Sequence, residues 1–276
     1  MIVEQIWTGS LFRNFNYLIA CDHTGEALAI DPLDHRKCLA VARRRGWEIT
    51  RIVNTHHHID HIAGNKRLVA ATGARVLAHS GAAKRIRGVD QGLNEGDIIR
   101  VGRSVELMVM DTPGHTLSHV CLVTLTDPPA LFSGDTLFNA GAGNCHQGGD
   151  PHALYRTFSN RLAGLDERTL IYPGHDYLRR NLLFTLSVEP DNAVAAALLE
   201  EGQTKDSGYV ATLGMEKDIN AFFRLEQQSI HAQLRQFDPA MPEDPDPEQV
   251  FVCLRQRRNR WSVPWSEKLR AVRSRF

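Results

Sequence analysis

The sequence contains no long hydrophobic run and no excess of charge of either sign. No stretch approaches the roughly 18 apolar residues of a membrane helix, and the start, MIVEQIWTGS, has neither a basic nor an apolar leader segment. Thirty-two basic residues balance 32 acidic ones, so no general attraction to nucleic acid or to an anionic membrane is expected. We therefore expect a cytoplasmic protein without nucleic-acid or membrane partners.

Cysteine is scarce, and its number is odd. Five cysteines lie far apart along the chain, so we expect reduced thiols rather than a disulfide framework. The remaining composition, 42% hydrophobic and 23% charged, is ordinary for a globular protein. A chain of 276 residues is long enough for one large domain, or for a domain with a helical appendage.

Histidine, in contrast, is concentrated at one place. His56, His58, Asp60 and His61 follow directly after an apolar run that is typical of a buried strand. His56 and His58 should leave the end of that strand on the same side, because alternate strand residues share a face. Asp60 and His61 open the segment 60–72, which has helix-like spacing and favours a carboxylate at its N-terminus. One strand-to-helix turn thus offers ligands on two sides, which favours two adjacent cations.

The alternative for any single histidine is an ordinary surface or core residue. A buried cluster without metal, however, would leave several polar groups competing for partners, which is unfavourable. His57 points the other way along the strand, and we expect it not to be a ligand.

Three later strand-like runs each end at a small or Pro-Gly turn that presents one coordinating side chain. These side chains are His115, Asp135 and His175, after the runs 105–111, 130–132 and 169–172. Ligands on turns at sheet ends are held by a rigid scaffold, as a metal site requires. His119, four residues after His115, is expected to be a core histidine that orients a ligand.

The pattern of strands and helices indicates layered α/β packing followed by a helical part. Predicted strands are 2–7, 15–21, 26–32, 49–54, 74–78, 97–101 and the three runs above, the first three mostly antiparallel. Predicted helices and helix-like segments are 35–46, 60–72, 152–165, 178–188, 191–201, 213–224, 226–237 and 248–260, with a polar loop at 202–208. No convincing strand follows His175. We place a boundary near Val188, between a catalytic domain (1–188) and a helical C-terminal region (189–276).

The glycine-rich segment 139–150 is expected to form a loop over the site. Cys145 and His146 within it are either loop residues without chemistry or part of the substrate entrance. The last helix carries Arg255, Arg257, Arg258 and Arg260. A solvated surface is the usual explanation of such a run, but Arg255 and Arg258 share a face and offer a sharper alternative, an anion site.

The order of the candidate ligands resembles the metallo-β-lactamase superfamily. Within it, the motifs THHHIDH, TPGHT, SGDTLF, PGHDY and NLLFTLSVEPDN are similar to glyoxalase II, the hydroxyacylglutathione hydrolases. The resemblance covers about residues 2–261 and leaves 262–276 without an assigned role. It implies an α/β fold, an αββα sandwich with a helical C-terminal domain.

The resemblance also implies a ligand set for two divalent metal ions. His56, His58 and His115 would bind one ion, Asp60, His61 and His175 the other, with Asp135 bridging both. Zinc is the first choice, with iron or manganese as alternatives. Such ions lower the pKa of bound water, which can then attack a thioester without a protein nucleophile. Asp60 and Asp135 are the expected catalytic carboxylates, and S-D-lactoylglutathione or a related acylglutathione is the implied substrate.

The substrate contacts that the resemblance implies match only in part. Tyr177 follows the last histidine ligand as in the family, and Arg255 and Arg258 lie where a basic pair grips glutathione. Asn144 and His146 stand where the family usually has lysine and tyrosine. Losing that lysine removes a charge-assisted contact of about 1.5–3 kcal/mol, so a different thiol carrier stays open.

Several rival functions share the expected scaffold. Persulfide dioxygenases are similar in fold but use a single iron, held by two histidines and an aspartate, while lactonases and β-lactamases use two-metal sites. The GHDY and EPDN stretches favour glyoxalase II over these. A non-catalytic sensor should lack a ligand, whereas all seven are present. We expect a monomer or a small homo-oligomer.

Overall fold

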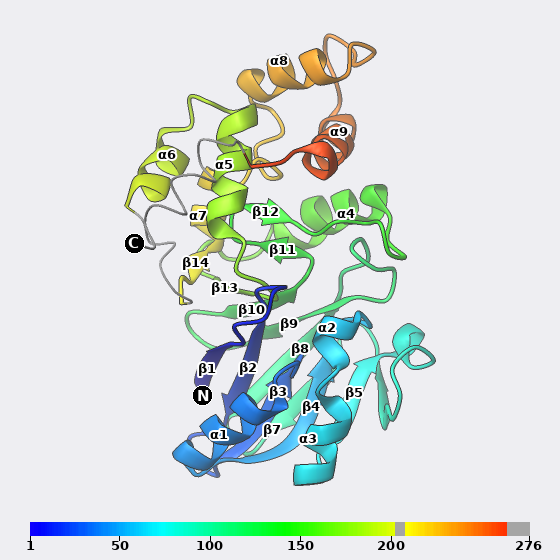
Figure 1. Cartoon of the computed structure of the whole chain (residues 1–276), viewed down its shortest axis with the longest axis vertical. Helices are drawn as coiled ribbons and strands as arrows, with labels where there is room; N and C mark the ends of the chain where they lie inside the picture. Colours follow the sequence, from blue (N-terminus) through cyan, green and yellow to red (C-terminus); the bar gives the residue numbers. More distant parts are fainter. Residues whose placement is uncertain (202–207, 264–276) are drawn as a thin grey trace.

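A computed structural model describes residues 1–201 and 208–263, and two six-stranded sheets form its centre (Figure 1). The first sheet has the order β1-β2-β3-β4-β5-β6. Its strands are β1 (Ile2–Trp7), β2 (Phe15–Ala20), β3 (Glu26–Ile30), β4 (Glu48–Asn54), β5 (Arg75–His79) and β6 (Gln91–Leu93). The first three strands are antiparallel, as predicted, and β3 to β6 run parallel.

The second sheet has the order β14-β13-β10-β9-β8-β7. Its strands are β7 (Ile98–Val101), β8 (Val105–Asp111), β9 (Val120–Thr124), β10 (Ala130–Gly134), β13 (Leu170–Pro173) and β14 (Ala211–Thr212). The prediction that no strand follows His175 was wrong, because β14 pairs antiparallel with β13. It is only two residues long, too short to show an alternating pattern.

Three apolar layers show that the architecture is the expected αββα sandwich. One layer, with Tyr17, Leu28 and Phe132, lies between the sheets. A second layer covers the outer face of the first sheet, beneath α1 (His35–Arg45) and α3 (Asn65–Thr72). The third covers the second sheet and contains residues of α4 (Pro151–Thr157) and of the helices that follow it. Helices therefore pack on both outer sheet faces, and Figure 1 shows α1 and α3 on the first of them.

Two predicted helices of the sandwich are interrupted. The segment 60–72 is divided into α2 (Ile59–Ile62) and α3, with Gly64 between them. A Cβ atom at Gly64 would overlap the carbonyl oxygen of Pro32, so a tertiary contact requires glycine there. The segment predicted as 152–165 is α-helical only through α4 and continues as a π-helical turn, Phe158–Leu162.

The C-terminal part is helical, as predicted. Its helices are α5 (Leu178–Val188), α6 (Ala193–Glu200), α7 (Leu213–Ile219), α8 (Gln228–Phe237) and α9 (Pro247–Arg260). α7 ends before Arg224 because Asn220 leaves the helix in an extended conformation. α5 packs against both α6 and α8, while the boundary near Val188 stays a prediction. Residues 202–207 of the predicted polar loop (202–208) and the tail 264–276 lie outside the described residues.

The strands that lead to the predicted ligands all run in the same direction along their sheets. β4 ends just before His56, and β8, β10 and β13 end just before His115, Asp135 and His175. The carboxyl ends of the strands therefore place the predicted ligands at one edge, beside the helical part (Figure 1).

All five cysteines are free. No helix in the described ranges is long and apolar enough to cross a membrane.

Candidate metal centre

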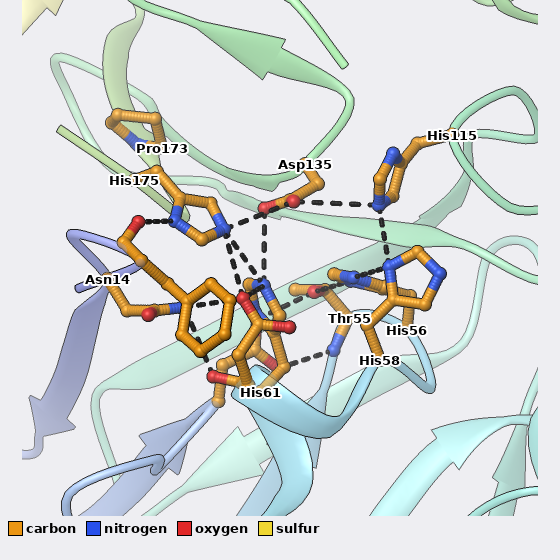
Figure 2. Close-up of polar contacts among 12 residues, drawn as sticks. Asn14, Thr55, His56, His58, His61, His115, Asp135, Pro173 and His175 are labelled. Atoms are coloured by element: carbon orange, nitrogen blue, oxygen red, sulfur yellow. Dashed lines mark hydrogen bonds and ion pairs between the residues drawn. The ribbon is translucent and has the colours of Figure 1, made fainter. Parts of the chain in front are cut away.

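Three histidines from two sheets meet at one side of the candidate site (Figure 2). His56 Nε2 lies 3.1 Å from His58 Nδ1, and His115 Nε2 lies 2.9 Å from the same atom. The three nitrogens fall within 4.8 Å of one another. They form the first triad, His56, His58 and His115.

A second group of ligand atoms lies beside the first. His61 Nε2 and His175 Nε2 are 3.2 Å apart, and Asp60 Oδ2 lies 3.7 Å and 3.6 Å from these two nitrogens. All three ligand atoms again lie within 4.8 Å of one another. They form the second triad, Asp60, His61 and His175. Asn14 Nδ2 donates to Asp60 Oδ2 at 3.1 Å and fixes this carboxylate from the loop before β2.

Asp135 joins the two triads. Its Oδ2 lies 3.5 Å from His115 Nε2 and 3.2 Å from His175 Nε2, and its Oδ1 lies 3.4 Å from His61 Nε2 (Figure 2). The residue is only 6% exposed, and Oδ1 has no hydrogen-bond partner in the described part of the chain. A buried carboxylate oxygen of this kind is costly unless a cation compensates it.

The hydrogen bonds around each ring determine which nitrogen faces the centre. Four of the five histidines donate their other ring nitrogen to an oxygen that can only accept. These bonds are His58 Nε2 to Gln147 O at 3.2 Å, His61 Nδ1 to Asp31 Oδ2 at 3.0 Å, His115 Nδ1 to Asn144 O at 2.6 Å and His175 Nδ1 to Phe12 O at 2.7 Å.

His56 follows the same rule through Thr55. The Thr55 hydroxyl donates to Asp31 Oδ2 at 2.6 Å, so it accepts from His56 Nδ1 at 3.0 Å. Each ring therefore turns an unprotonated nitrogen towards its neighbours. Ligand atoms about 2.1 Å from a tetrahedral ion lie about 3.4 Å apart, close to the spacings seen here, so the residues present fit two metal ions.

Asp31 belongs to a third possible ligand group, with His56 and His61. Its oxygens, however, accept from Thr55 N at 2.9 Å as well as from the Thr55 hydroxyl and His61 Nδ1. Asp31 therefore orients the ligands His61 and, through Thr55, His56 by hydrogen bonds. Sequence reasoning missed it, and only its position after β3 in the turn Asp31-Pro32 hinted at a role.

The electrostatic balance keeps His56 and His115 neutral and Asp135 charged. Burial lowers the pKa of His56 well below its ordinary value and that of His115 to about 4. Burial alone would raise the pKa of the Asp135 carboxyl, but His175 and His61 hold it well below its usual range. Neutral imidazoles and an ionised carboxylate are the forms that bind metal.

The other two histidines near the cluster behave as predicted. His119 is buried, and its Nε2 accepts from the backbone N–H of Asp135 at 3.1 Å. Its Nδ1 lies 2.8 Å from the Thr112 hydroxyl, so the His119 ring connects Thr112 to the backbone of Asp135. His57 lies outside all three ligand groups, and its Nε2 is 2.9 Å from Arg85 Nη1.

Comparisons with known proteins agree with this geometry. Residues 13–175 match the model of the metallo-beta-lactamase superfamily, and residues 176–261 match the model of the hydroxyacylglutathione hydrolase C-terminus. A hydroxyacylglutathione hydrolase from Nitrosococcus oceani is 57% identical over 95% of this chain and 100% of its own length. One from Polaromonas sp. is 58% identical over the same shares.

The chain belongs to the hydroxyacylglutathione hydrolase family.

Solved structures with lower sequence identity to this chain show the same fold. ETHE1 from Myxococcus xanthus matches with a TM-score of 0.66 and 24% identity, over 94% of this chain and 98% of its own. A protein called TTHA1623, solved in a di-iron-bound form, matches with a TM-score of 0.58 and 25% identity, over 79% of this chain and 99% of its own. Both likenesses support the αββα architecture.

The predicted substrate residues lie on the helical side of the centre, but not all of them are equally accessible. The Tyr177 ring stacks on His175 with centroids 4.9 Å apart, and its hydroxyl donates to Phe12 O at 3.1 Å. Asn144 and His146 are exposed, and the Asn144 side chain accepts from the His146 backbone N–H at 3.2 Å. Tyr177 and Asn144 thus lie beside proposed metal ligands, while the contacts of Tyr177, Asn144 and His146 with a substrate stay a prediction.

The two arginines of α9 differ. Arg258 is partly exposed, and its Nη2 donates to Asn181 Oδ1 at 3.3 Å. Burial, together with the positive charges of Arg180 and Arg255, lowers the pKa of Arg258 from 12.5 to about 9. Arg255 is only 4% exposed and donates to the backbone of the glycine-rich segment. Sequence reasoning missed Arg180, an exposed residue of α5, because nothing in its local pattern separates it from an ordinary surface arginine.

Proposed function

We propose that this family member hydrolyses acylglutathione thioesters, S-D-lactoylglutathione among them, to a carboxylic acid and glutathione. The observation that carries the proposal is Asp135, buried between two complete triads and within 3.5 Å of a histidine from each. The names of the relatives that match over their whole length support the same substrate class.

In this proposal each triad holds one divalent ion, with zinc preferred over iron or manganese. Two ions would lower the pKa of the attacking water and polarise the thioester carbonyl. The chain's own residues fix the geometry. Asp135 fixes the distance between the two triads. Asp60 supplies the carboxylate of the second triad, and a hydrogen bond from Asn14 holds that carboxylate in place.

The helical side of the centre supports recognition of an anionic thiol carrier. Glutathione carries carboxylates, and Arg258 and Arg180 place two positive charges close enough to repel each other. A bound carboxylate would relieve this repulsion and add charge-assisted hydrogen bonds. Tyr177 lies beside the second triad, because its ring stacks on His175. We therefore propose Arg258 and Tyr177 as substrate contacts, with Asn144 and His146 at the exposed edge.

A substrate panel tests the proposal. Purified protein is assayed with S-D-lactoylglutathione, an acyl-coenzyme A and a simple acyl thiol ester, and metal content is measured on the same sample. We expect two ions per chain and the highest kcat/KM for the glutathione ester. Faster turnover of the coenzyme A ester would overturn the choice of carrier. Oxygen uptake with glutathione persulfide and one iron per chain would instead establish a dioxygenase.

A further inference from the structure

A short strip of backbone, Asn139–Asn144, connects the helical part of the protein to the metal centre. It follows β11 (Leu137–Phe138) and includes β12 (Gly141–Ala142), which pair as a small hairpin. Side chains of α5, α7 and α9, and of Asn220 directly after α7, bond to five backbone atoms of this strip. Backbone groups in a loop otherwise find their partners in turns or in water.

The individual bonds follow the strip in order. Asn181 Nδ2 donates to Asn139 O at 2.9 Å, the Ala140 N–H donates to Glu216 Oε2 at 2.8 Å, Asn220 Nδ2 donates to Gly141 O at 3.1 Å, and Arg255 Nη1 donates to Ala142 O at 2.7 Å and to Gly143 O at 3.1 Å. The bonded side chains, from Asn181 to Arg255, all come from the helical part.

The last residue of the strip orients a metal ligand. Asn144 O accepts from His115 Nδ1 at 2.6 Å, and this bond fixes which nitrogen His115 turns towards His58. Gly143 packs closely beneath the centre, since a Cβ atom there would overlap the carbonyl oxygen of Asp135. A shift of the peptide groups at Ala142 and Gly143 would therefore move the carbonyl that holds His115.

Arg255 is the residue of α9 that reaches this point. Its guanidinium lies over the Phe222 ring at 5.4 Å, and its Nε donates to Asn259 Oδ1 at 3.1 Å. A buried cation is tolerated only where acceptors compensate it, and here two carbonyls of the strip do so. Removing the side chain would leave these two carbonyls unpaired and the strip free to relax.

We propose that Arg255 is a positioning residue for the first triad: through the carbonyls of Ala142 and Gly143 it sets Asn144 O, which holds His115. This rests on the proposed role of His115 as a metal ligand. The sequence predicts that Arg255 and Arg258 bind the substrate together. In this proposal, only Arg258 contacts the substrate, whereas Arg255 orders the metal centre.

Zinc affinity tests the inference without relying on turnover. The apoprotein of Arg255→Ala is titrated with zinc against a competing chelator, and cobalt(II) replaces zinc in a parallel absorption measurement. We expect one of the two zinc affinities to fall about 10- to 100-fold, the range seen when an outer hydrogen-bond partner of a ligand is lost. In the cobalt titration, Arg255→Ala and His115→Ala should alter the absorption of the same one of the two bound ions. The kcat should recover in excess zinc, with KM nearly unchanged.

Three further variants make the result specific. Arg257→Ala is the matched control, because Arg257 donates to Gln233 O and Ser187 O within the helical part. It should leave both zinc affinities unchanged. Arg255→Lys keeps one donor and should lose less affinity than Arg255→Ala, which provides a readable variant if the alanine protein does not fold. In a double-mutant cycle, Arg255→Ala should add little to His115→Ala.

Each alternative outcome points to a different error. Unchanged zinc affinity with a raised KM would make Arg255 a substrate anchor and overturn the inference. An equal loss from both zinc sites, or the same loss in Arg257→Ala, would show general destabilisation and overturn it as well. If His115→Ala itself binds two zinc ions with normal affinity, the proposed metal assignment fails instead.

Discussion

The two triads of the metal centre are built in different ways. The outer nitrogens of His61 and His175 bond to Asp31 Oδ2 and to Phe12 O, which lie beside β3 and before β2 of the first sheet. Both rings are buried, at 0% and 3% exposed. The second triad is therefore supported within the αββα sandwich.

The first triad depends on the glycine-rich segment. His115 and His58 donate to Asn144 O and Gln147 O, two carbonyls of this segment, and His58 is partly exposed. The helical part holds that segment through Asn139–Asn144. One ion site therefore belongs to the sandwich, whereas the other needs the sandwich and the helices together. Single substitutions in each part test this difference.

Asp135→Ala should affect both ion sites equally, because Asp135 contacts both triads. One carboxylate lies between His61, His115 and His175, so its loss should release both metal ions and reduce thioester hydrolysis to background. Metal analysis and a thioesterase assay on the same sample check this. Two retained ions with near-normal turnover would rule out the joining role of Asp135.

Asp31→Ala should mainly damage the second triad. Its carboxylate holds His61 and Thr55, and Thr55 in turn holds His56, so we expect a loss of about 10- to 100-fold in metal affinity. The zinc titration with competing chelator measures it. Asp34→Ala is the control, since Asp34 caps the N-terminus of α1 and should reduce stability by about 1 kcal/mol without changing metal affinity. Unchanged zinc affinity in Asp31→Ala would contradict its orienting role.

Arg258→Ala should sharpen the contrast between the two arginines of α9. Loss of one charge-assisted contact, about 1.5–3 kcal/mol, predicts a KM for S-D-lactoylglutathione at least about 10-fold higher, with little change in kcat or zinc affinity. Steady-state kinetics measure the split. Arg260→Ala, an exposed residue at the end of the same helix, is the control. An unchanged KM would exclude Arg258 from the substrate site.

Glu216→Gln should have the smallest effect, on stability rather than activity. Burial raises the pKa of Glu216 from 4.5 to about 8, although bonds from Asn220 and Ala140 act the other way. Between pH 4.5 and 8 the folded chain keeps a proton that the unfolded chain releases, so the free energy of unfolding falls as the pH rises through this window.

Glutamine removes this titration, so its melting temperature should exceed that of the wild type by a few °C near pH 8 and equal it near pH 4.5. Thermal melts across that pH range measure the difference. Parallel curves for the two proteins would show that Glu216 is ionised in the folded state.

The sequence predicts the ligands well because each carries a local pattern. His56 to His61 are contiguous with a strand end, and His115, Asp135 and His175 each follow an apolar run and a tight turn. The partners that hold these ligands have no such pattern. Asp31 bonds to a histidine 30 residues away, and the Phe12 carbonyl to one 163 residues away. A backbone carbonyl, moreover, has no side-chain identity to recognise.

The fold follows the same division between local and tertiary causes. Helices with clear spacing and caps, such as α1 and α9, match their predicted positions. The break at Gly64 and the early end of α7 at Asn220 arise from contacts with Pro32 and Gly141. Such contacts override helix propensity and are invisible in a local pattern. The burial of Arg255 belongs to this group, because it depends on the carbonyls of Ala142 and Gly143, which lie far away along the chain.

In the proposed function, two metal ions, one on each triad, act together in hydrolysis. This is tested by adding zinc stepwise to the apoprotein and following hydrolysis of S-D-lactoylglutathione and bound zinc on the same samples. We expect little activity up to one zinc per chain and full activity at two. Full activity at one zinc per chain, or in the chelator-treated protein, would contradict it.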